Sequence, residues 1–123
     1  MSPRQSPATA HELQRVGLLA TLSGESLRKL AGRMQREEIA PGEAIVLEGG
    51  TDDRFYIVLS GVLAVTQETR GARRVLRPGD YFGEVAAAMG VPRTATVRAL
   101  STATVASCDR ATFDELVKPI FSA

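Results

Sequence analysis

The sequence is poor in the residues that build disulfide frameworks and most metal sites. Its 123 residues include one cysteine, Cys108, and one histidine, His11. One cysteine excludes an internal disulfide framework and any iron–sulfur or multi-cysteine site. One histidine argues against histidine-rich metal catalysis and against most hydrolase sites that use a histidine base. We therefore expect no bound metal, and the low cysteine content fits a cytoplasmic protein.

Long apolar runs and an excess of one charge are also absent. The longest uncharged, apolar-rich stretch, 55–67, has 13 residues and is interrupted by Ser60 and Gly61, whereas a membrane-spanning helix needs about 20. The 15 basic and 14 acidic residues leave a formal net charge of +1. That balance is not the footprint of a protein that binds nucleic acid. We expect neither a membrane span nor a nucleic-acid partner.

The chain has the size and composition of one globular domain. Hydrophobic residues make up 44% of it, and a chain of this length buries roughly two thirds of its unfolded surface. Residues 1–10 contain Pro3 and Pro7 but no apolar core, so they are not a signal peptide. We expect a flexible tail over 1–10, followed by a single domain over 11–123.

Helical patterns lie at the two ends of the chain. A short helix is predicted over 11–19, and a second over 24–35 with Ser23 as its N-cap, because its apolar residues recur at helical spacing. A closing helix is predicted over 111–117, ending before Pro119.

Between these helices the pattern is that of short strands separated by glycine and proline turns. Turn signals every 8 to 12 residues favour an antiparallel sandwich or roll. With its flanking helices, the predicted fold is an α+β antiparallel β-roll of jelly-roll type. The predicted strands cover 44–48, 54–60, 62–68, 73–77, 94–99 and 102–107.

The segment from Pro78 to Val97 breaks the strand pattern. Its residues 84–89 predict a short helix, and small side chains near the helix start leave free N–H groups open to a ligand. Glu84 is an acceptor for hydroxyl groups, and Arg93, nine residues later, is a partner for phosphate oxygens. This combination predicts a site for a ligand with a phosphate and a hydroxyl.

These residues carry a resemblance. The run FGEVA at 82–86, followed by PRTATVRA at 92–99, resembles the phosphate-binding cassette of cyclic nucleotide-binding domains. That family includes catabolite activator protein, the regulatory subunit of cAMP-dependent protein kinase and cyclic nucleotide-gated channels. The resemblance extends from about Leu13 to Lys118 and includes the PGD turn at 78–80. It implies a short helix within the cassette and a ligand pocket beside it.

The resemblance also implies a role for each cassette residue. Glu84 is expected to bind the ribose 2′-hydroxyl, and Arg93 to neutralise the cyclic phosphate. The ribose and phosphate are expected to be lined by the backbone of Gly83, Val85 and Ala86, with a further phosphate donor from the backbone N–H of Thr94 or Ala95.

The purine is expected to pack on strands that precede the cassette. Val65 and Leu76 match the apolar positions that similar domains use for the base. Strand alternation places Arg74 on the same face as Leu76, where it would stack on the base or donate to it. The hydroxyl of Thr94 suits a guanine, but similar domains that respond to cAMP also carry one. We expect cAMP as the preferred ligand, with cGMP as an open alternative.

The predicted function is that of a regulatory sensor and not of an enzyme. The chain ends at Ala123, where similar domains usually continue into a longer helix, so the effector domain or protein is expected to lie outside it. The helices at 10–19 and 111–121 are the expected moving parts. An enzyme of cupin type would need several histidines. A ligand-free interaction module on the same fold, with Glu84 and Arg93 as a structural ion pair, stays open.

Overall fold

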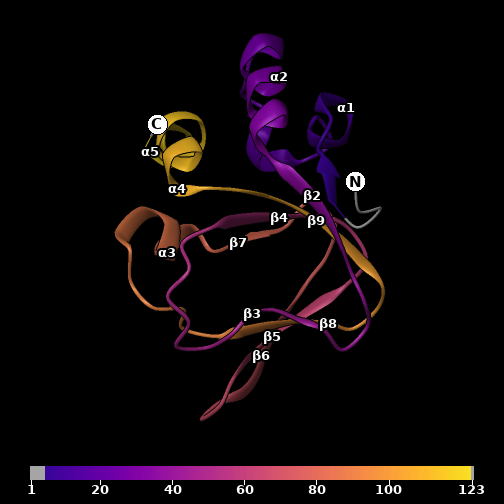
Figure 1. The fold of residues 1–123 in the computed structure, drawn as a ribbon, viewed down its shortest axis with the longest axis vertical. Coiled ribbons are helices and arrows are strands. Elements are labelled where there is room, and N and C mark those ends of the chain that lie inside the picture. Colours follow the sequence, from indigo (N-terminus) through magenta and orange to yellow (C-terminus); the bar gives the residue numbers. More distant parts are fainter. Residues whose placement is uncertain (1–4, 123) are drawn as a thin grey trace.

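Two antiparallel sheets and a layer of helices make up the fold. The computed structural model describes residues 5–122. The larger sheet has the order β1-β2-β9-β4-β7, and the smaller one has the order β3-β8-β5-β6. Figure 1 shows most of the helices on the outer side of the larger sheet and the smaller sheet on its other side. The strands are β1 (Gln5–Pro7), β2 (Gln35–Ile39), β3 (Ala44–Val46), β4 (Phe55–Ser60), β5 (Leu63–Gln67), β6 (Gly71–Leu76), β7 (Tyr81–Phe82), β8 (Thr96–Ala99) and β9 (Ala103–Cys108).

The helices gather at the two ends of the chain, apart from one that interrupts the strands. None of them, within residues 5–122, has the length and apolar character to cross a membrane. The two antiparallel sheets, the flanking helices and the short helix in the cassette confirm the expected α+β antiparallel β-roll. The helical elements are α1 (Ala10–Leu13), a 3₁₀ turn (Gly17–Leu19), α2 (Gly24–Arg33), α3 (Glu84–Met89), α4 (Arg110–Thr112), a π-helical turn (Phe113–Val117) and α5 (Lys118–Ser122).

The apolar residues divide into two cores, one on each side of the larger sheet. The first lies between that sheet and the helices and includes Leu30, Phe55 and Phe113. The second lies between the two sheets and includes Val58 and Leu76. Every residue of β9 is buried, because the helices cover one face of this strand and the smaller sheet covers the other.

The second predicted helix is present but shorter than expected. Ser23 is its N-cap, and its side chain accepts a hydrogen bond from the Ser26 N–H at 3.1 Å. The helix ends at Arg33, since Met34 is extended and β2 begins at Gln35. The prediction of helix to residue 35 was wrong because the polar QREEI sequence gains its ladder hydrogen bonds from β9, which local propensity does not reveal.

The chain ends also differ from the expectations. Where a flexible tail was expected over 1–10, Gln5–Pro7 forms β1 and pairs with β2, while residues 1–4 lie outside the described part. The expected helix over 11–19 divides into α1 and the 3₁₀ turn.

At the other end, helical structure does not stop before Pro119. The Lys118 N–H donates to the carbonyl of Phe113, five residues back, and α5 then continues to Ser122. Pro119 has no N–H, so it interrupts the helical hydrogen-bond ladder at this point, directly after the five-residue turn.

Candidate functional site

Gly83 joins β7 to α3 in a conformation that favours glycine. Its φ angle is 88°, in the left-handed region. A Cβ atom at this position would lie 2.7 Å from the Arg93 Nη1 atom and 2.7 Å from the Arg54 carbonyl oxygen. The absence of a side chain at Gly83 therefore makes room for the guanidinium of Arg93.

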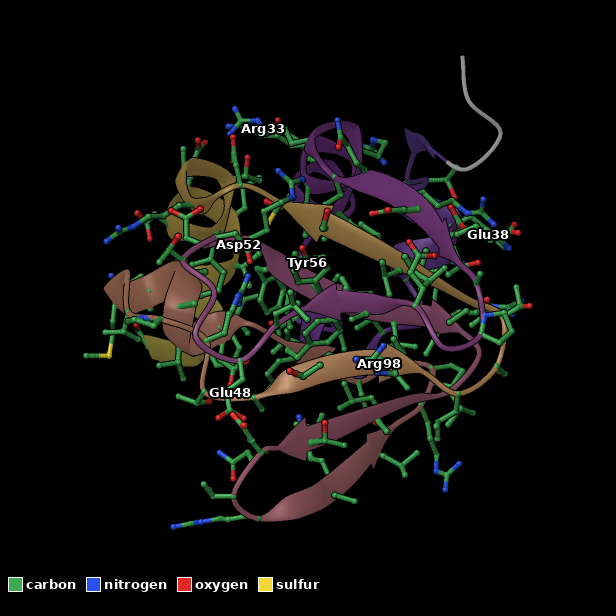
Figure 2. All side chains as sticks on the ribbon, turned by 60° about the horizontal axis from the view of Figure 1, so that its bottom comes forward. Arg33, Glu38, Glu48, Asp52, Tyr56 and Arg98 are labelled. Atoms are coloured by element: carbon green, nitrogen blue, oxygen red, sulfur yellow. The ribbon has the colours of Figure 1, made fainter. Side chains whose placement is uncertain are left out.

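Arg93 is held in place by the loop between β3 and β4. Its backbone N–H donates to the Gly50 carbonyl, and its own carbonyl accepts from the Gly49 N–H, both at 2.8 Å. Its Nη2 donates to Asp52 Oδ1 at 2.5 Å and to the Arg54 carbonyl at 2.8 Å. The Arg93 Nε donates to Asp52 Oδ2 at 3.3 Å. Asp52 is labelled on this loop in Figure 2.

Aromatic rings support the same guanidinium. The Arg93 guanidinium carbon lies 5.8 Å from the ring centre of Tyr56, which Figure 2 labels on β4. The Tyr56 ring stacks on Phe82, with centroids 4.8 Å apart and an interplanar angle of 3°. Burial raises the pKa of Tyr56, so the ring stays neutral over the physiological range. Arg93 is only 6% exposed, and these contacts fix its orientation.

Two buried polar atoms of the cassette have no hydrogen-bond partner within residues 5–122. They are Glu84 Oε2 and Arg93 Nη1. Among the described residues, Glu84 and Arg93 do not form an ion pair with each other. Arg93 pairs with Asp52 instead. Buried polar atoms are nearly always satisfied, so this acceptor and this donor have hydrogen-bonding capacity that the protein itself does not use. A structural Glu84–Arg93 ion pair, the alternative considered from the sequence, does not form.

Both orphaned atoms belong to side chains that line one cavity of about 150 Å³. All the residues predicted for the ligand site line it except Leu76. Val46, Phe82, Pro92 and Val97 also contribute, although the sequence alone did not assign them to the ligand. The predicted residues that line the cavity are Val65, Arg74, Gly83, Glu84, Val85, Ala86, Arg93, Thr94 and Ala95.

Leu76, which was expected beside the base, does not line this cavity. It has 0% exposure and lies in the core between the two sheets. In the β5–β6 hairpin it is paired with Leu63, whereas Arg74 is paired with Val65 at the cavity. Leu76 therefore lies on the expected side of β6 but two residues, about 7 Å, further along the strand. Alternation predicts the face of a strand but not where along it a cavity opens.

Asp52 is the partner of Arg93 that the sequence analysis did not identify. Nothing near Asp52 in the sequence suggests a partner, and Arg93 is 41 positions away. Burial acts to raise the pKa of its carboxyl, but the hydrogen bonds and charge of Arg93 outweigh burial and hold that pKa below its ordinary value. Asp52 therefore stays ionised, and it pairs with Nη2 and Nε of Arg93, which leaves Nη1 without a hydrogen-bond partner among the described residues.

The comparison with known families agrees with this geometry. Residues 36–119 match the cyclic nucleotide-binding domain family. The chain is also 39% identical, over 87% of its length, to the cAMP-dependent protein kinase regulatory subunit of Debaryomyces hansenii. The chain therefore belongs to the cyclic nucleotide-binding domain family. It spans 24% of the length of that yeast relative.

Solved structures share the fold. The regulatory domain of Toxoplasma gondii PKA with cAMP is 29% identical, with a TM-score of 0.86 over 92% of this chain and 45% of that one. The regulatory subunit of a cAMP-independent protein kinase A from Trypanosoma brucei is 23% identical. Its TM-score is also 0.86, over 91% of this chain and 41% of that one, and this likeness shows the fold alone. The fold by itself therefore does not identify a ligand.

Proposed function

We propose that the domain binds a 3′,5′-cyclic nucleotide, with cAMP preferred, and acts as a regulatory sensor. The observation that carries the proposal is the pair of unpartnered atoms, Glu84 Oε2 and Arg93 Nη1, on side chains that line one cavity. A cyclic nucleotide has a ribose 2′-hydroxyl that donates to a carboxylate and phosphate oxygens that accept from a guanidinium. Sequence similarity to regulatory subunits of cAMP-dependent protein kinase supports the choice of cAMP.

The surrounding residues fit this ligand. Gly83 and the first residues of α3 bring backbone N–H groups to the cavity wall, without large side chains over them. In this proposal Val65 and Arg74 lie beside the purine, and the Thr94 hydroxyl is close enough to the base to influence the choice between adenine and guanine.

The output of the sensor would pass through the helices. Ala87 of α3 packs with Phe113 and Val117 of the π-helical turn in the core between the larger sheet and the helices. A ligand that draws α3 toward its phosphate would therefore also shift the C-terminal helices. A ligand can act only through its different affinities for two such arrangements. The effector, a domain or protein outside this chain, and a cytoplasmic setting are further parts of the proposal.

The test is titration calorimetry of the chain with cAMP, cGMP and 5′-AMP, in parallel with Arg93→Ala. Loss of the charge-assisted bonds to phosphate should weaken cAMP binding by about 100-fold. Arg98→Ala is the matched control, since Arg98 is exposed and donates to the Gly42 carbonyl away from the cavity. It should bind as the wild type does. Absence of cyclic nucleotide binding would reject the proposal in favour of the ligand-free module.

A further inference from the structure

Gln67, the last residue of β5, makes a contact with the cassette backbone that the proposed function leaves unexplained. Its Nε2 donates to the carbonyl oxygen of Thr94 at 2.9 Å. Because a carbonyl only accepts, the orientation of the Gln67 side-chain amide is fixed by this bond. Gln67 is not among the residues that line the nucleotide cavity. It lines a separate hollow together with Glu48 and Thr96.

The bond sets the direction of one backbone donor. The Thr94 carbonyl and the Ala95 N–H belong to the same peptide group. Peptide bonds are trans throughout the described residues, and the C=O and N–H of a trans peptide point in opposite directions. Gln67 holds the carbonyl toward β5 and so directs the Ala95 N–H the other way. Ala95 lines the nucleotide cavity, and its N–H has no backbone acceptor among the turn and loop hydrogen bonds of residues 5–122.

The same bond also strengthens that donor. A carbonyl that accepts a hydrogen bond polarises its peptide group, which makes the N–H of that group a better donor. The preceding residue, Arg93, is held separately by Gly49 and Gly50 of the loop before β4. The segment from Arg93 to Ala95 is thus held from two sides, by that loop and by Gln67.

We infer that Gln67 is a positioning residue for the phosphate site, acting through the Thr94–Ala95 peptide without touching the ligand. The inference rests on the proposed function. It extends the phosphate site to a residue 26 positions before Arg93 in the sequence and outside the cassette.

The first experiment compares three substitutions of Gln67 by calorimetry with cAMP. Gln67→Met removes the side-chain donor and adds no charge. Gln67→Glu removes the donor and adds a negative charge, whereas Gln67→Lys still has a side-chain donor. The first two should weaken binding by about threefold to tenfold, the range of one hydrogen bond, while Gln67→Lys retains affinity. Gln14→Met, at an exposed site on the N-terminal turn, is the control and should bind as the wild type does.

The second experiment separates positioning from a general loss of structure. The two phosphorothioate diastereomers of cAMP each replace one exocyclic phosphate oxygen with sulfur, a weak acceptor. If Gln67 acts through the Ala95 N–H, the loss caused by Gln67→Met shrinks for the diastereomer whose sulfur faces this N–H and persists for the other. A merely structural role would reduce the affinity for both diastereomers equally.

The outcomes separate the inference from the proposed function. Equal cAMP affinities of the wild type and Gln67→Met, a loss confined to Gln67→Glu, or equal losses for both diastereomers would overturn the role of Gln67 while cyclic nucleotide binding stands. A wild-type chain that binds no cyclic nucleotide would overturn the proposed function and this inference together.

Discussion

Replacing Asp52 with asparagine tests whether the loop before β4 holds the buried guanidinium of Arg93. Asp52 accepts two hydrogen bonds from this guanidinium. The Arg93 side chain is 4% exposed, while that of Asp52 is 47% exposed. Asparagine keeps the shape of the side chain but removes the charge that compensates Arg93.

The expected loss of stability lies between the values for buried and exposed pairs. Breaking a buried pair costs about 3–5 kcal/mol, whereas an exposed pair contributes less than about 1 kcal/mol. Asp52 is half-exposed, and the Arg54 carbonyl still accepts from Arg93 in the variant. We therefore expect the free energy of unfolding to fall by about 1–2 kcal/mol, which lowers the Tm by roughly 3–8 °C.

Urea unfolding with and without saturating cAMP measures this effect. A bound cyclic phosphate is a second anion for Arg93, so the loss should be smaller in the presence of ligand. Asp53→Asn, one residue along the same loop, is the matched control and should unfold like the wild type. The reasoning fails if the two variants have the same stability, or if cAMP leaves the loss caused by Asp52→Asn unchanged.

The Asp52→Asn variant should also change how the free energy of unfolding depends on pH under acidic conditions. The pKa of Asp52 is lowered from 3.8 in the folded protein, because Arg93 outweighs the effect of burial. The contribution of Asp52 is therefore present above pH 3.8 and is lost as the pH falls through the lower folded-state pKa. Asp52→Asn should lack this part of the pH dependence in acid unfolding followed by circular dichroism.

Three further predictions concern other parts of the fold. Gly83→Ala should lower the free energy of unfolding in urea by about 1–3 kcal/mol, because its Cβ would clash with Arg93 and its φ angle is positive. Gly32→Ala is the control: it lies in a helix with open space around it and should stabilise the protein. Glu115→Gln should lose the part of the acid dependence between pH 4.5 and about 2, since two basic side chains of α2 lower the pKa of Glu115 from 4.5 to about 2 and its contribution disappears as the pH falls. Cys108, whose thiol pKa is raised to about 12 by burial, should react with thiol reagents only after unfolding.

Each of these has an outcome that contradicts it. Equal stabilities of the Gly83→Ala and Gly32→Ala variants would show that the close approach of Arg93 is not required. Parallel acid-unfolding curves for wild type and Glu115→Gln would show that the contact between α2 and the C-terminal helices contributes nothing. Labelling of Cys108 in the native protein at the rate seen in urea would place this thiol outside the core.

Local sequence was informative where the determinants are local. The strands with apolar runs, such as β4 and β9, were predicted close to their observed bounds. Strands β1, β2 and β7 were missed, since they are short or polar and are stabilised by pairing with distant strands. The π-helical turn before Pro119 was missed as well, because an apolar pattern does not reveal a shift from four-residue to five-residue hydrogen bonding.

In the site, the cassette is the part that could be predicted from the sequence alone. Glu84 and Arg93 are nine residues apart around one short helix, so their types and spacing are visible along the chain. Three features became visible only in the folded chain: the partner of Arg93, the burial of Leu76 and the contact from Gln67 to Thr94. Each depends on segments that are distant in the sequence and are brought together by strand pairing and by packing between the two sheets, and no local pattern encodes that proximity.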